Sequence, residues 1–157
     1  MNKFIKIGVV TLFALFLAAC NKADPKADYA KLAEWMQLNQ VDQASFQTQY
    51  NQKISTGDTT QLKEAMVALV ERNTKLIKSL KAINIKDPEI QKLQDKTIEV
   101  LTYSSDLTES VINLANNPSP SNEVVKSLQE KTQKAQLLTA DLQRMRAELA
   151  AKYANTH

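Results

Sequence analysis

Cys20 is the residue in this sequence best suited to covalent chemistry, and it stands where an apolar run ends and a polar one begins. A thiol is the most nucleophilic ordinary side chain, and it can form a disulfide, bind a metal or take a covalent group. Cys20 is the one cysteine in the chain, so an intrachain disulfide is excluded. The one histidine, His157, is the last residue and is expected to be solvated. Cys20 therefore lacks the partners that a metal site or a catalytic pair would need.

The sequence also lacks the residues that other kinds of catalytic, metal or cofactor site need. The two glycines, Gly8 and Gly57, lie far apart and form no phosphate-binding loop, and no serine-nucleophile motif occurs. The Glu-x-x-His pairs of di-metal bundles and the Cys-x-x-Cys-His motif of covalent haem are absent. Glu64 and Glu71 are expected on a charged, solvated helix face. The sequence predicts that the protein is not an enzyme and binds no metal or cofactor.

The charge balance argues against binding of nucleic acid. The chain has 20 Lys and Arg against 17 Asp and Glu, a formal net charge of +3. Lys3 and Lys6 precede the apolar run, so without them 18 basic residues face 17 acidic ones and the net charge is +1. Binding to phosphates needs a clustered basic surface, which this balance does not indicate.

Residues 1–19 have the order of a secretory signal. Two lysines come first, an apolar run over residues 7–17 follows, and Ala18 and Ala19 come directly before Cys20. A helix made from the 11 residues of that run spans about 16 Å, whereas the hydrocarbon core of a bilayer is about 30 Å thick. The run is too short to cross a membrane comfortably, so a cleaved signal peptide over residues 1–19 is predicted.

The tetrapeptide Leu17-Ala18-Ala19-Cys20 resembles the lipobox of bacterial lipoproteins. The resemblance implies cleavage between Ala19 and Cys20, and a diacylglyceryl group attached to Cys20 as a thioether. Two or three acyl chains of the palmitate type would then anchor the protein. Asn21 follows where an aspartate tends to mark the inner membrane, which favours the outer membrane with the protein facing the periplasm. The alternatives are an inner-membrane anchor, or an ordinary signal peptide followed by an unused thiol.

Beyond a short polar tether over residues 20–26, the sequence predicts one all-α domain over residues 27–154. Glycine and proline are rare, and apolar residues recur in steps of three and four over residues 62–83, 90–114 and 124–149. The first helix, over about Ala27–Ile54, is less regular, and Asp42 could start a second piece within it. Gly57 is suited to a left-handed C-terminal cap.

Helix starts are indicated by Asp58, by Asp87-Pro88 and by Ser119-Pro120. The last helix is expected over about Pro120–Tyr153. Because the connections are short, the predicted fold is an antiparallel up-down-up-down four-helix bundle with coiled-coil-like packing. The alternative is a three-helix bundle with a loosely docked first segment.

Polar residues interrupt the predicted apolar seam, and they have two interpretations. In one, they satisfy carbonyl groups of their own helices or fix the register of packing. In the other, they line a polar pocket or groove for a ligand. These residues are Asn39, Gln43, Asn73, Thr97 and Ser104. Arg144 and Arg146, which flank Met145, are interpreted as a solvated helix face rather than a contact for lipid headgroups.

Aromatic residues concentrate in the first helix. Trp35, Phe46 and Tyr50 are expected either to pack in the core or to form a partner-binding face near the membrane. The chain resembles, in type, the small helical bacterial lipoproteins of unknown function. The sequence thus favours a membrane-anchored, non-enzymatic binding, scaffolding or assembly-accessory module with an envelope protein as partner, a pilotin-like chaperone being the sharper variant. The alternative is a carrier of a small hydrophobic or lipid ligand inside the bundle.

Overall fold

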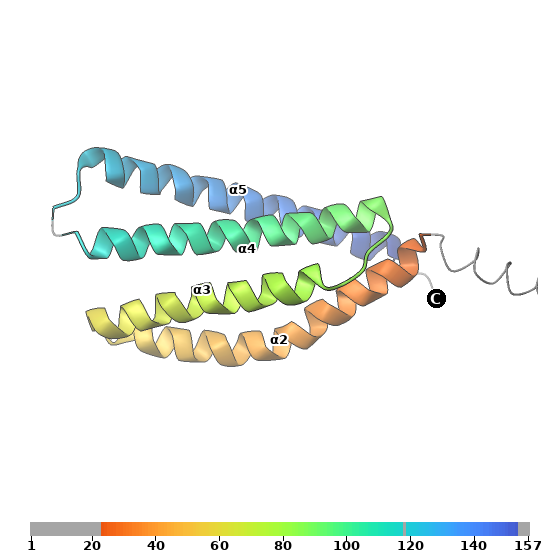
Figure 1. Cartoon of the computed structure of the whole chain (residues 1–157), viewed down its shortest axis with the longest axis horizontal. Helices are drawn as coiled ribbons and strands as arrows, with labels where there is room; N and C mark the ends of the chain where they lie inside the picture. Colours follow the sequence, from red (N-terminus) through yellow and green to blue (C-terminus); the bar gives the residue numbers. More distant parts are fainter. Residues whose placement is uncertain (1–22, 118, 154–157) are drawn as a thin grey trace, which may run out of the picture.

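The computed structural model of the chain describes residues 23–117 and 119–153. Within these ranges lie four helices and no strand: α2 (Pro25–Ser55), α3 (Thr59–Lys81), α4 (Pro88–Ala115) and α5 (Asn122–Tyr153). Successive helices run in opposite directions (Figure 1). None of them is both long enough and apolar enough to cross a membrane. The prediction of an all-α domain with four helices is confirmed.

Aspartates begin three of the helices. The carboxylate of Asp58 accepts a hydrogen bond from Gln61 N at 2.9 Å, and Asp87 accepts from the backbone of the first turn of α4, as predicted. Asp24 caps α2 in the same way, so α2 begins at Pro25 and the predicted start at Ala27 was two residues late. Asp24-Pro25 repeats the start signal of the helix that follows Asp87, a signal that the prediction assigned to the tether.

The predicted start of α5 was wrong. The helix begins at Asn122, and Ser121 rather than Ser119 caps it, with Ser121 O accepting from Val125 N at 3.2 Å. Ser119 N instead donates to the side chain of Asn117 at 3.1 Å, which keeps Ser119 in the preceding loop. The cap at Ser121 also places Glu123 in the first turn, where a negative charge favours the helix dipole.

The first helix is continuous, because α2 extends through Asp42 without a second start. It bends partway along its length (Figure 1). Gly57 follows its C-cap with φ of +68°, which confirms the predicted left-handed position.

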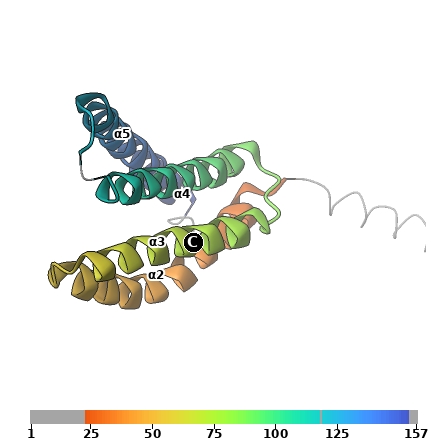
Figure 2. The same ribbon diagram turned by 60° about the vertical axis from the view of Figure 1, so that its left-hand side comes forward.

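The central hairpin of α3 and α4 packs along its length, with α2 beside α3 and α5 beside α4. No Cα atoms of α3 and α5 lie within 8 Å of each other. The outer helices α2 and α5 meet near the start of α2, where the ring centres of Tyr29 and Tyr153 lie 5.7 Å apart. At the other end of the domain the two helices lie apart (Figure 2). We call the end with the start of α2, the loop 82–87 and the end of α5 the closed end. The end with the loops 56–58 and 116–121 is the open end.

The hydrophobic core lies at the closed end. Its fully buried side chains include Leu32, Leu80, Ile90 and Leu93, which come from α2, α3 and α4. From α5 it takes Leu142 and Leu149. The four helices therefore share a core over part of their length, and a bundle with coiled-coil-like packing throughout is not confirmed. The first half of α2 belongs to this core, whereas most of its second half is exposed.

Candidate functional site

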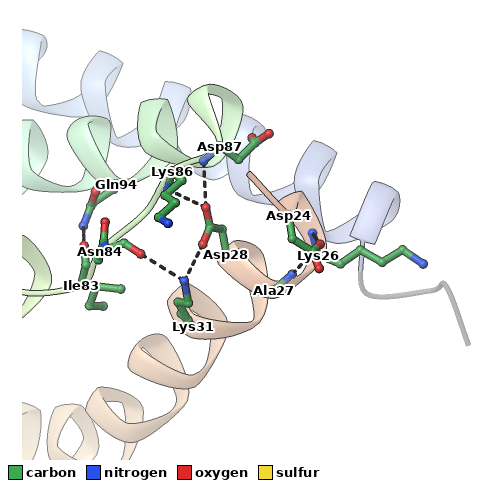
Figure 3. Close-up of polar contacts among 10 residues, drawn as sticks. All are labelled: Asp24, Lys26, Ala27, Asp28, Lys31, Ile83, Asn84, Lys86, Asp87 and Gln94. Carbon is green, nitrogen blue, oxygen red and sulfur yellow. Dashed lines mark hydrogen bonds and ion pairs between the residues drawn. The ribbon is translucent and has the colours of Figure 1, made fainter. Parts of the chain in front are cut away.

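Asp28 binds three groups at the closed end (Figure 3), although it is only 3% exposed. Its Oδ2 accepts hydrogen bonds from Lys86 N at 2.6 Å and Asp87 N at 2.8 Å, across almost 60 residues of sequence. Its Oδ1 receives Lys31 Nζ at 2.6 Å, and Lys31 also donates to Asn84 O at 3.1 Å. One carboxylate thus ties the start of α2 to the loop between α3 and α4. We call these contacts the Asp28 latch.

The latch holds Asp28 in its charged form. Burial alone would raise the pKa of this carboxyl group, but the hydrogen bonds from Lys31, Asp87 and Lys86 outweigh burial and lower the pKa below its ordinary value. Its hydrogen-bond donors and its countercharge are all protein groups that fix the fold. The contacts of Asp28 therefore join separate parts of the fold.

Gln94 supports the same loop from inside the core (Figure 3). Its Nε2 donates to Leu80 O in the last turn of α3 at 2.7 Å and to Ile83 O in the loop 82–87 at 3.0 Å. Carbonyl groups at the end of a helix lack a partner within it, so the buried amide of Gln94 supplies a donor to both.

A second set of contacts lies on the exposed surface of the closed end. Glu89 Oε2, at the start of α4, accepts from Lys152 Nζ and from Tyr153 OH, at 2.5 and 2.8 Å. The hydrogen bond from Lys152 is the main cause of the lowered pKa of Glu89, and it raises the pKa of Lys152. The ring of Tyr153 lies 5.7 Å from that of Tyr29. These contacts join α5 to both α4 and α2.

A groove of about 430 Å³ lies beside the middle of α2, and all four helices line it. Its apolar side chains are Trp35, Met36, Leu76 and Leu101. Its polar side chains are Asn39, Gln40, Gln43, Arg72, Thr97 and Arg146. The lining thus combines apolar walls, neutral hydrogen-bonding groups and two cations, and no Asp or Glu contributes to it. We call this the arginine groove.

Arg146 is partly buried in the arginine groove and lacks compensation for that burial. Its Nε is buried and has no hydrogen-bond partner among the described residues. Burial lowers the pKa of its guanidinium group. An unsatisfied buried donor costs on the order of 1–3 kcal/mol. The arrangement therefore favours a ligand that accepts hydrogen bonds or carries a negative charge.

Arg72 enters the groove from α3 and has a different neighbourhood. Its guanidinium carbon lies 5.0 Å from the centre of the Phe46 ring, a cation–π geometry. Burial lowers the pKa of Arg72, while the charge of Asp42 acts in the opposite direction. Among the described residues, neither Arg72 nor Arg146 forms an ion pair within 4.0 Å. Arg144, by contrast, pairs with Asp141 at 2.9 Å.

The polar residues of the predicted seam separate into two groups. Asn39, Gln43 and Thr97 line the arginine groove, where Thr97 also donates to the carbonyl of its own helix at Leu93. Asn73 is 2% exposed and lies elsewhere, with its amide donating toward α4. Ser104 is outside the groove and its carbonyl accepts from Thr108. The structure thus brings together part of the candidate pocket.

The three aromatic residues of the candidate partner face do not share one environment. Trp35 packs against the core, lines the arginine groove and donates from Nε1 to Ser79 Oγ at 2.9 Å. Phe46 lies beneath Arg72 and beside Tyr50, with ring centres 6.0 Å apart. All three are partly buried. A partner-binding role for them stays a prediction.

Several other predictions from the sequence concern residues that the structure does not describe. The signal peptide, the cleavage point at Ala19 and Cys20, and His157 all lie outside the described residues.

Within residues 23–117 and 119–153, no three His, Cys, Asp or Glu side chains cluster to hold a metal ion. Glu64 pairs with Lys53 at 2.7 Å on an exposed surface, as its predicted charged face implies.

Sequence reasoning missed the Asp28 latch and the role of Arg146 in the groove. Asp28 lies in the first turn of α2, where an acidic residue is ordinarily explained by the helix dipole, so its sequence position gave no signal of burial. Arg146 was interpreted as solvated together with Arg144, and that is correct for Arg144 alone. A signal for the groove did exist in the polar pair Asn39 and Gln43, which interrupts the apolar seam of α2.

An all-helical domain that follows a lipobox-like tetrapeptide is typical of small lipoproteins of the bacterial envelope. Residues 26–154 match the model of the family described as "Uncharacterised lipoprotein PM1805", and the chain belongs to this family. The protein is therefore a bacterial lipoprotein, a class anchored to an envelope membrane through a lipidated cysteine. Comparisons with curated proteins and with solved structures found no match.

Proposed function

We propose that this lipoprotein is a non-enzymatic binding module of the envelope that holds a small amphipathic ligand in the arginine groove. The observation that carries the proposal is the groove itself, an opening of about 430 Å³ with apolar walls and two arginines that form no ion pair with another described residue. Small-molecule sites commonly have about 300–1,000 Å³ and a few polar groups on apolar walls. The only hydroxyl group lining it, that of Thr97, is bonded to its own helix, which argues against a nucleophile there.

Cys20 is the proposed attachment point, and the outer membrane, with the domain in the periplasm, is the proposed location. Cys20 precedes the helix cap Asp24 by four residues, which reach at most about 14 Å. Lipidation at Cys20 would hold the closed end near the bilayer, with the open end pointing away. Residue 21 is Asn21 rather than the aspartate that tends to mark the inner membrane, and this favours the outer membrane.

The anchor is tested with Cys20→Ser in the full-length chain. We expect loss of labelling by radioactive palmitate and accumulation of the unprocessed precursor. Asn21→Asp is the matched variant for location, since it should keep the label and move the protein to the inner membrane fraction. Labelling that persists in Cys20→Ser would contradict attachment at this residue.

The ligand is tested by native mass spectrometry of residues 21–157, secreted into the periplasm behind a cleavable signal without a lipobox. This segment contains every helix and every core side chain that the structure describes. We expect a bound species of discrete mass that is lost in Leu101→Glu, where a negative charge is placed in the groove wall. A domain that is consistently empty would contradict the proposal.

An assembly-accessory role, of which a pilotin-like chaperone is one form, is the second candidate. It is favoured by another groove, of about 450 Å³, between α4 and α5 at the open end. Leu114, Val124 and Leu128 line it, and Val124 is 45% exposed. We expect photocrosslinkers at Val124 to capture one envelope protein, whereas crosslinkers at Lys31 on the closed end should not. Equal capture from both positions would count against this role.

A further inference from the structure

We propose that the ligand of the arginine groove is a single-chain anionic amphiphile, such as a fatty acid or a lysophospholipid, with its acidic group at Arg72 and Arg146. This inference rests on the proposed binding function and assigns its ligand class. Its acyl chain would lie along the apolar side chains of Trp35, Met36, Leu76 and Leu101, which line the same groove.

The choice of arginine supports an anionic headgroup. The chain has only three arginines among its 20 basic residues, and two of them, Arg72 and Arg146, line this groove. A guanidinium group presents a planar fork of donors that matches a carboxylate or a phosphate, which an ammonium group does not. No carboxylate lines the groove itself, although the charge of Asp42 acts on Arg72 from outside it. The third arginine, Arg144, lies outside the groove and is already paired with Asp141.

The position of Arg146 shows what a ligand would add. Its Nε is buried without a partner, while α2 and α4 supply Trp35 and Leu101 to the same groove. An apolar ligand would leave the guanidinium groups of Arg146 and Arg72 without a countercharge, and a small inorganic anion would leave the apolar walls in contact with water. A molecule with an acidic head and one hydrocarbon chain satisfies both parts of the lining.

The size of the groove limits the ligand to one chain. Its volume of about 430 Å³ is near the lower end of the range for small-molecule sites, and its lining includes four polar side chains besides the arginines. These are the amides of Asn39, Gln40 and Gln43 and the hydroxyl of Thr97. Amides beside a carboxylate or phosphate can donate further hydrogen bonds to it.

Trp35 makes the test direct, because it is the only tryptophan in the chain and it lines the groove. Residues 21–157 would be delipidated and titrated with oleate below its critical micelle concentration, and the fluorescence of Trp35 would be followed. Oleyl alcohol serves as the uncharged probe of the same chain length. Oleoyl lysophosphatidic acid serves as the phosphate-headed probe and separates a preference for phosphate from one for carboxylate.

For the wild-type chain, we expect saturable binding of oleate at least about tenfold tighter than that of oleyl alcohol. Arg146→Gln and Arg72→Gln should each weaken oleate binding about tenfold and leave oleyl alcohol binding within about twofold. Arg144→Gln, two residues from Arg146 on α5, is the matched control and should change neither. Unchanged binding of the uncharged probe also shows that each variant is folded.

Three results would separate the inference from the proposed function. If oleate and oleyl alcohol bind equally well, or if neither arginine variant weakens oleate, the anionic class is wrong while a binding groove remains. If none of the three probes binds, both the ligand class and the proposed function fail. Tighter binding of oleoyl lysophosphatidic acid than of oleate supports the inference and assigns the headgroup as phosphate.

Discussion

The closed end and the open end of the domain are built from the same four helices, yet they are held together differently. At the closed end, all four helices contribute to one core, and buried polar contacts such as the Asp28 latch join segments distant in sequence. At the open end, α2 and α5 have separated, and large apolar side chains such as Val67 and Val124 are more than 40% exposed.

The apolar periodicity of a helix does not by itself determine how much of the helix is buried. In α5 the apolar residues keep the spacing of a packed seam from Val124 to Leu149, except at Lys131 and Thr132, but only Leu142 and Leu149 are buried. The first half of this helix faces α4 without a second neighbour, because α3 never approaches it and α2 has diverged. The arginine groove lies where this change occurs.

The largest test of the comparison removes core volume at the closed end. Leu80 is 0% exposed, and Leu80→Ala should lower the free energy of unfolding by about 2–5 kcal/mol, since it leaves a cavity in the core of the closed end. Leu128→Ala at the open end is the matched variant, with an expected loss of about 1 kcal/mol because Leu128 is only partly buried. Both are measured by urea unfolding followed by circular dichroism. Equal losses of unfolding free energy would contradict the difference between the two ends.

Asp28→Asn tests the latch and should lower the free energy of unfolding by about 1.5–3 kcal/mol at pH 7, because it removes the charge that Lys31 and two backbone N–H groups bind. The folded-state pKa of Asp28 is lowered. Its stabilisation is therefore complete above the unfolded pKa of about 4 and is lost as the pH falls through the folded value.

The gap between wild type and Asp28→Asn should accordingly be present at pH 7 and narrow below about pH 4. Asp24→Asn is the control on the same helix, since asparagine caps a helix about as well as aspartate and the expected change is within about 0.5 kcal/mol. A gap that stays constant from pH 7 to pH 2 would show that the charge of Asp28 does not stabilise the closed end.

Gly57→Ala tests the turn between α2 and α3 at the open end. The φ of +68° at Gly57 is strained for alanine, although no atom lies within 4 Å of the added Cβ, so the expected loss is about 1 kcal/mol. Gly57→Asn should lose less, because asparagine tolerates the left-handed conformation better. If Gly57→Ala were more destabilising than Asp28→Asn, the open end would be the main support of the domain.

The smallest effect is expected at the ion pair between Lys53 and Glu64, which also joins α2 to α3 at the open end. The two side chains are 41% and 56% exposed, so the double-mutant coupling energy should be under about 1 kcal/mol. It should decrease further in 0.5 M NaCl because the pair is exposed to solvent. A coupling energy as large as the loss in Asp28→Asn would remove the distinction between a buried and an exposed contact.

Local signals explain what the sequence predicted well. Asp58 and Asp87 act on N–H groups within three or four residues, and Gly57 acts through its own φ angle, so each can be recognised in a short stretch. The start of α5 was missed because Ser119 and Ser121 are both good caps, and the side chain of Asn117 decides between them.

The groove and the latch depend on where distant segments meet, which a short stretch does not contain. The backbone N–H groups that bind Asp28 lie 58 and 59 residues away, and the groove needs Arg146 of α5 beside Trp35 of α2. Arg144 and Arg146 are the same residue type only two positions apart. They differ in the face of α5 that each occupies. The polar pair Asn39 and Gln43 was recognised in the sequence, but the two cations that lie with it were not.

The position of Asp28 near the start of α2 has a mechanical consequence. Tension that arrives along the chain from its N-terminal side reaches the cap at Asp24 first and Asp28 one helical turn later. The N–H groups bound to Asp28 belong to Lys86 and Asp87, so the load passes into the central hairpin of α3 and α4 near the point where it enters the domain. The second half of α2 and the arginine groove beside the middle of this helix then carry less of a load applied through the membrane anchor.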